Sequence, residues 1–72
     1  MLRFEAIQLL VEMCDSLDFI RSATQISLDE VAETKIVIQM NYDNDCLKTL
    51  REFVEKRNYK LEEKSNNVLV IY

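Results

Sequence analysis

The chain has 72 residues, of which 49% are hydrophobic and 31% are charged, and its net charge at pH 7 is −4. This balance is typical of a folded chain rather than a disordered one, and it predicts a single small domain spanning 1–72. The acidic balance argues against sequence-independent nucleic-acid binding, which depends on Lys and Arg to neutralise phosphates. No apolar run approaches the roughly 20 residues that span a bilayer, so we expect no membrane association.

The first 26 residues allow two interpretations. Six apolar residues recur at the spacing of one helical face: Ala6, Leu9, Leu10, Met13, Leu17 and Ile20. Four residues instead alternate with their neighbours as a half-buried strand would: Ile7, Leu9, Val11 and Met13. A sheet of only three strands would be too small to cover two helices, so we favour the strand. A helix would then follow, capped by Asp15 or Ser16 and running to about Thr24. A long N-terminal helix is the alternative.

The segment Ser27-Leu28-Asp29-Glu30 has the form of a capping box, in which Glu30 reaches back to the backbone of the first residue. It predicts a short turn through Val31. The alternating, β-branched segment Lys35–Met40 then predicts a strand.

A second helix is expected near 45–57. Its apolar residues lie on one helical face: Leu47, Leu50, Phe53 and Val54. Asp43, Asn44 or Asp45 can cap its start, which favours a turn and cap over a calcium loop for the oxygen-rich segment 41–45. The chain has no glycine, so Asn58 is the expected left-handed residue at its end.

Two short strands are predicted near 59–63 and 68–72, joined by a hairpin turn at Ser65-Asn66-Asn67. The fold class is therefore α/β. We expect a two-layer sandwich with a small mixed β-sheet and two helices on one face, in the order β-α-β-α-β-β. The alternative is an α+β fold with a long N-terminal helix and a β-α-β-β unit.

Few residues can support chemistry. Histidine is absent, which removes the usual general base and metal ligand, and a glycine-rich phosphate loop is impossible without glycine. We therefore expect no enzyme, no catalytic residues, no cofactor and no metal site. Cys14, at the predicted strand–helix junction, would meet the positive end of the helix dipole, which favours a reactive thiolate. The other interpretation makes Cys14 a small buried hydrophobe, and Cys46 is best explained by packing or partial exposure.

The order of predicted elements, with Cys14 at a strand–helix junction, resembles the TusA/SirA family of sulfur carriers. The resemblance runs from about Leu9 to Tyr72 and is best at 33–38, 41–45 and 68–71. The family motif is Cys-Pro-x-Pro, whereas this chain has Cys14-Asp15-Ser16-Leu17, with the cysteine and neither proline. The resemblance implies a four-stranded mixed sheet with two helices on one face, and a persulfide carried on Cys14.

Two functional hypotheses follow. The first is a small persulfide carrier that acts through Cys14. The second is a non-catalytic protein-interaction or regulatory module on the same scaffold. Both imply a protein partner. The segment Met1–Ala6 lacks the charged-then-apolar layout of a secretory signal, so we expect a cytoplasmic protein with reduced thiols.

Overall fold

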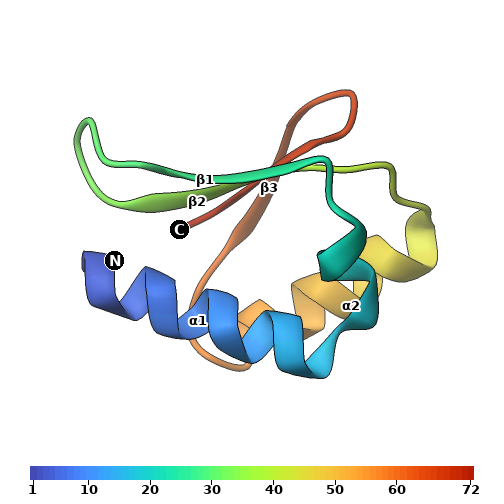
Figure 1. Ribbon diagram of the computed structural model, residues 1–72, viewed down its shortest axis with the longest axis horizontal. Coiled ribbons are helices and arrows are strands. Elements are labelled where there is room, and N and C mark those ends of the chain that lie inside the picture. The colour runs from blue at the N-terminus through green and yellow to red at the C-terminus, as the bar shows by residue number, and fades with distance from the viewer.

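The computed structural model describes all of residues 1–72 as two layers, with two helices on one face of a four-stranded sheet (Figure 1). The elements follow one another as α1 (Arg3–Ser16), the 3₁₀ turn η1 (Asp18–Ser22), β1 (Gln25–Asp29), β2 (Lys35–Gln39), α2 (Asn44–Glu55), β3 (Leu61–Ser65) and β4 (Val68–Ile71). The small layered fold with both α and β elements is therefore as predicted. Neither helix combines the length and the apolar character that crossing a bilayer requires.

The sheet has the strand order β1-β2-β4-β3, and every neighbouring pair is antiparallel. The prediction of a mixed sheet is therefore wrong. The second half of the chain nevertheless contains the predicted strand–helix–strand–strand unit. Strands β2 and β3 run in the same direction because each is antiparallel to β4, which lies between them. Helix α2 thus connects two strands of the same direction, and the last strand, β4, lies between them in the sheet.

The strand predicted at Ile7–Met13 is wrong, and the alternative, an N-terminal helix, is correct for the segment up to Ser16. Its buried residues Ala6, Leu9 and Met13 keep helical spacing. The Glu5 side chain accepts a hydrogen bond from the backbone N–H of Leu2 at 2.8 Å and so helps to start the helix. The element order is consequently α-β-β-α-β-β, apart from η1, and begins differently from the order that the family resemblance implied.

The capping box predicted at 27–30 is also wrong, because this segment belongs to β1 and its hairpin. Ile26 pairs with Ile38 of β2, and Leu28 pairs with Ile36, so β1 extends the apolar face of the sheet that the helices cover. The Asp29 carboxylate instead accepts a hydrogen bond from the backbone N–H of Val31 at 3.1 Å, within the β1–β2 turn. Strand β1 is the fourth strand of the sheet, and with it the sheet is wide enough for both helices to pack against it.

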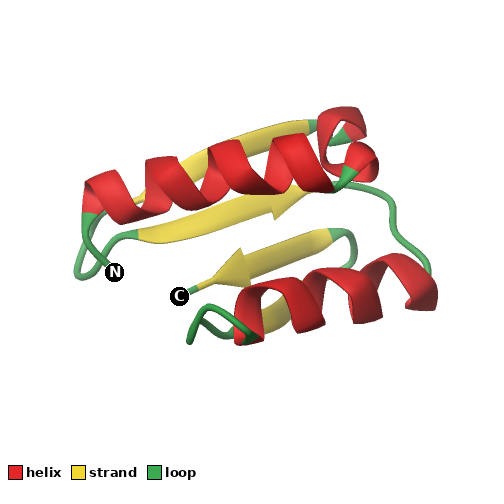
Figure 2. Ribbon diagram, turned by 90° about the horizontal axis from the view of Figure 1, so that it is seen from below, coloured by secondary structure: helices red, strands yellow, loops and turns green.

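The core lies between the helical layer and the sheet. It contains thirteen buried residues: Ala6, Leu9, Met13, Leu17, Ile20, Ile36, Ile38, Met40, Leu50, Val54, Leu61, Leu69 and Ile71. Seen from the helical side, α1 lies over β1 and β2, while α2 lies over the β4–β3 half of the sheet (Figure 2). Each helix therefore covers about two strands.

The chain has no glycine or proline, so Asp and Asn residues mark the ends of its helices and turns. The Asp43 carboxylate accepts a hydrogen bond from the backbone N–H of Cys46 at 2.8 Å, which confirms the predicted cap of α2. Asn58 has a φ angle of 66°, in the left-handed region, as predicted for the end of α2. Asn67, in the predicted turn of the last hairpin, has the same φ angle.

Candidate functional site

The outer flank of α1 is unusually apolar. Successive helical residues are rotated by about 100°, so Leu10, Cys14, Ile7 and Val11 follow one another around the helix next to its buried stripe. We call these four residues the outer flank of α1. A globular helix normally carries polar side chains on the faces that its own core leaves uncovered. Here the apolar surface continues well beyond the buried stripe.

Much of this surface is open to solvent. The exposed fractions are 47% for Ile7 and 55% for Val11, and Phe4, the next residue around the helix, is 64% exposed. Six large hydrophobic residues of the chain are exposed, and four of them lie on α1 or at its start: Leu2, Phe4, Ile7 and Val11. Single exposed apolar residues need no explanation, whereas a group on one helix marks a candidate binding surface.

A shallow cavity of about 330 Å³ lies between this flank and the edge of the sheet. Its lining is Ile7, Leu10, Val11, Cys14, Asp15 and Ile26. Ile26 is contributed by β1, so the cavity joins the first helix to the first strand. Five of its six lining residues are hydrophobic, and the one charged group, Asp15, is exposed.

Strand β1 bounds this cavity and forms one edge of the sheet, pairing only with β2. Its five residues pair in an unbroken antiparallel register, from Gln25 opposite Gln39 to Asp29 opposite Lys35. The outer edge of such a strand presents backbone N–H and C=O groups without strand partners. The candidate site therefore combines an apolar helical flank with a free strand edge.

Cys14, the predicted sulfur-carrying residue, belongs to this surface. It is a half-buried free thiol in the last turn of α1. Its predicted position at the start of a helix is wrong, because the helix begins eleven residues earlier, at Arg3. The positive end of the helix dipole therefore lies near Arg3, at the other end of the helix from Cys14.

Cys46 lies in the first turn of α2 and is half-buried, in agreement with the prediction of packing or partial exposure. Burial raises the pKa of its thiol, and a hydrogen bond with the neighbouring Asp43 raises it further. The backbone N–H of Cys46 donates a separate hydrogen bond to the Asp43 carboxylate, and this bond lowers the pKa of that carboxyl. The raised pKa keeps the thiol protonated at neutral pH, while the backbone N–H of Cys46 takes part in capping the helix.

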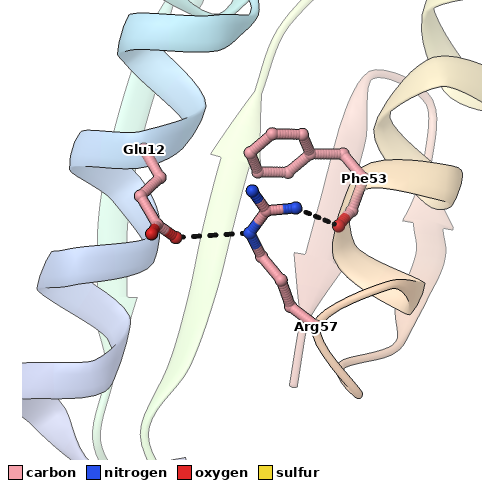
Figure 3. A network of polar contacts seen from close by, with 3 residues as sticks. All are labelled: Glu12, Phe53 and Arg57. Atoms are coloured by element: carbon pink, nitrogen blue, oxygen red, sulfur yellow. Dashed lines mark hydrogen bonds and ion pairs between the residues drawn. The ribbon is translucent and has the colours of Figure 1, made fainter.

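A second cavity, of about 380 Å³, lies on the opposite flank of α1, between the two helices. Here the Arg57 guanidinium lies 3.7 Å from the ring centroid of Phe53 and donates to that residue's carbonyl at 3.1 Å (Figure 3). Its Nε also donates to Glu12 at 3.3 Å. Arg57 is exposed, and its side chain links the end of α2 to α1.

The ring of Tyr59 lines the same cavity. Its pKa is raised, first by burial of the hydroxyl and then by the carboxylates of Glu5 and Glu12. The polar groups of this cavity thus already interact with one another. No group of three or more Cys, Asp or Glu side chains in the chain is arranged to hold a metal ion.

Sequence reasoning missed the outer flank because Ile7 and Val11 were assigned to the inner face of a strand. One signal could have found it. Between Phe4 and Cys14 the apolar residues occupy well over half of the circumference of a helix, more than one sheet can cover. Ile26 carries no such signal, because its place beside α1 depends on the pairing of β1.

Comparison with known proteins finds no matching family model, no matching curated protein and no matching solved structure. The resemblance to the TusA/SirA family therefore stays a prediction from the sequence.

Proposed function

We propose that this chain is a non-enzymatic protein-interaction module that binds its partner through the outer flank of α1 and the edge of β1. The observation that carries the proposal is the exposure of Ile7 and Val11 beside a free strand edge. Covering apolar surface contributes about 25 cal/mol per Å², and the strand edge offers backbone hydrogen bonds. The two features together supply both affinity and orientation.

The remaining surface supports binding better than catalysis. A catalytic site needs a nucleophile or an acid and base within hydrogen-bonding reach of each other. Cys14 has only apolar side chains and Asp15 among the residues that line its cavity. The polar groups around Arg57 link the two helices to each other.

Site-specific photo-crosslinking in cells that make the protein tests the proposal. A photoreactive amino acid at position 11 should give discrete cross-linked protein bands, because Val11 lies in the proposed interface. The same amino acid at position 48 should give none, because Lys48 is exposed on α2, outside the proposed interface. Equal cross-linking at both positions, or none at position 11, would refute the proposed surface.

A persulfide carrier acting through Cys14 is the second candidate. What favours it is the position of this free thiol within the apolar cavity, where a docked donor would reach it. In that reaction the donor persulfide passes its outer sulfur atom to Cys14 and leaves as a thiolate. Mass spectrometry after incubation with a persulfide donor should show one added sulfur atom, which Cys14→Ser abolishes and Cys46→Ser retains. Absence of loading on the wild type would exclude the carrier.

A further inference from the structure

We propose that the partner covering this surface is a second copy of the same chain, paired through β1 across a two-fold axis. This inference rests on the proposed interaction surface and specifies what occupies it. The two copies would form one continuous eight-stranded antiparallel sheet, with the two α1 helices side by side on the same face. A two-fold contact requires that one surface complement itself, and β1 and α1 meet that requirement in three ways.

The first is the strand register. In an antiparallel pair centred on Ser27, this residue faces Ser27 of the second copy. Ile26 then faces Leu28 on the side of the helices, and Gln25 faces Asp29 on the open side. Each apolar residue meets an apolar one, and no charge meets its like, which would be destabilising.

The second is the spacing of the layers. Neighbouring strands lie about 4.8 Å apart, so two strands span roughly 10 Å. Packed helices have axes 8–10 Å apart. Because α1 lies over β1 and β2 (Figure 2), adding two strands beyond β1 places the second α1 at this packing distance. The outer flanks of the two helices then face each other across the two-fold axis.

The third is direction and charge. Figure 1 shows that α1 and β1 run in opposite directions, so pairing β1 antiparallel also makes the two α1 helices antiparallel. Residues near the start of one helix then approach the end of the other, which brings Arg3 toward Asp15 of the second copy. The middle of the contact consists of the uncharged outer flanks. The remaining repulsion comes from the net charge of −4 on each copy.

A dimer of standard size would use essentially the whole of this side. Figure 1 looks along the shortest molecular axis toward α1 and β1, and the Cα atoms of the molecule span 29 by 23 Å across this view. A standard interface takes about 800 Å² of accessible surface from each partner. The opposite edge is less suitable, because β3 carries Glu62, Glu63 and Lys64 and its register is broken by a bulge.

Disulfide trapping tests the register directly. In a chain with both natural cysteines replaced by serine, Ser27→Cys places two thiols opposite each other at the two-fold axis. The Cα atoms of facing residues lie about 4.5–5.5 Å apart, within the range that a disulfide spans. We expect mild oxidation to cross-link most of the Ser27→Cys protein. Glu62→Cys is the matched control, because Glu62 lies in the same row of the sheet on the opposite edge strand and is expected to stay uncross-linked.

Sedimentation measurements on the unmodified chain provide the second test. We expect a species of twice the 8.5 kDa mass of one chain, and the dimer fraction should hold or rise with added NaCl, since salt screens the repulsion between two acidic copies. Ile7→Lys with Val11→Lys should weaken association at least tenfold. Gln8→Lys with Thr49→Lys adds the same charge at exposed positions outside the proposed interface and should leave the association intact.

The outcomes separate this inference from the proposed function. If the chain stays at 8.5 kDa at every concentration and position 27 gives no cross-link, the proposal that the partner is a second copy is wrong. Discrete photo-crosslinks from position 11 to other proteins would then leave the interaction module standing. Trapping of Glu62→Cys as efficient as that of Ser27→Cys would overturn the choice of edge.

Discussion

The two edges of the sheet are built differently. The β3 edge carries Glu62, Glu63 and Lys64, and a bulge between Glu63 and Ser65 interrupts its pairing. These features discourage another strand from pairing with an edge. The β1 edge has a regular register, a single charged residue, Asp29, and an apolar helical flank beside it. The chain thus protects one edge and leaves the other open, and this contrast is the physical basis for placing the interface at β1.

The two helices differ in the same way. Helix α2 is amphipathic, with Leu50 and Val54 buried and charged residues outward. Helix α1 buries a similar inner stripe but keeps Ile7 and Val11 in solvent. Both helices therefore contribute buried residues to the interior, and the difference between them lies on their outer sides.

The largest expected effects concern the shared interior. Leu9 and Leu50 are 2% and 0% exposed, so Leu9→Ala and Leu50→Ala should each lower the free energy of unfolding by about 2–4 kcal/mol. Val11→Ala and Lys48→Ala change exposed positions and should stay within about 0.5 kcal/mol. Urea melts at low protein concentration measure all four. If Val11→Ala cost as much as Leu9→Ala, the assignment of the outer flank of α1 would be wrong.

The link between the helices should have a smaller effect. Arg57→Ala removes a cation–π contact with Phe53 and an ion pair with Glu12. The Arg57 side chain is 36% exposed and that of Glu12 is 46% exposed, so solvent screens the pair and the total loss should be about 1 kcal/mol. Lys56→Ala at the neighbouring exposed position serves as the control. A loss no greater than that of the control would mean that the two helices are held together by the core alone.

Each helix contains one cysteine, and their reactivities extend the comparison. Burial and the contact with Asp43 raise the pKa of the Cys46 thiol, which lowers its thiolate fraction at neutral pH. Cys46 should therefore react with a disulfide reagent more slowly than Cys14 in the folded protein. Rates measured separately on Cys14→Ser and Cys46→Ser variants test this order. Faster reaction at Cys46 would show that the start of α2 opens readily.

The second half of the fold was predictable because its signals are local. The period of the apolar residues changes from strand to helix and back between Lys35 and Tyr72, and Asp43 and Asn58 stand at the ends of α2. The first half was not, since residues 4–14 fit both periods. The deciding factor was the fourth strand, which lies elsewhere in the chain, at Gln25–Asp29.

The candidate site was harder to predict than the fold. Cys14 was predicted from the sequence as a site residue, and it does lie on the candidate surface. The prediction assumed that Cys14 lies at the start of a helix, whereas it lies in the last turn of α1. The outer flank of α1 depends on which side of the helix the sheet covers, and that side is set by tertiary packing. A pattern of apolar residues shows how much surface must be covered, but not which part stays open.

The smallest expected effect concerns how α2 begins. The Asp43 carboxylate caps this helix by accepting from the backbone N–H of Cys46, and this contact lowers its pKa in the folded state below the ordinary 3.8. A lowered folded pKa means that the capping contribution is fully present above the unfolded value and is lost as the pH falls through the folded value. Asn can also cap a helix but does not titrate, so Asp43→Asn should cost little at pH 7.

The stability advantage of the wild type over the Asp43→Asn variant should therefore shrink as the pH falls below about 3.8, and urea melts of both proteins across this range measure it. Asp45→Asn is the control, because Asp45 lies in the same turn without capping the helix. A difference between the wild type and Asp43→Asn that stays constant down to low pH would show that the charge contributes nothing to the cap. The start of α2 would then rely on hydrogen-bond geometry alone, as an uncharged amide does.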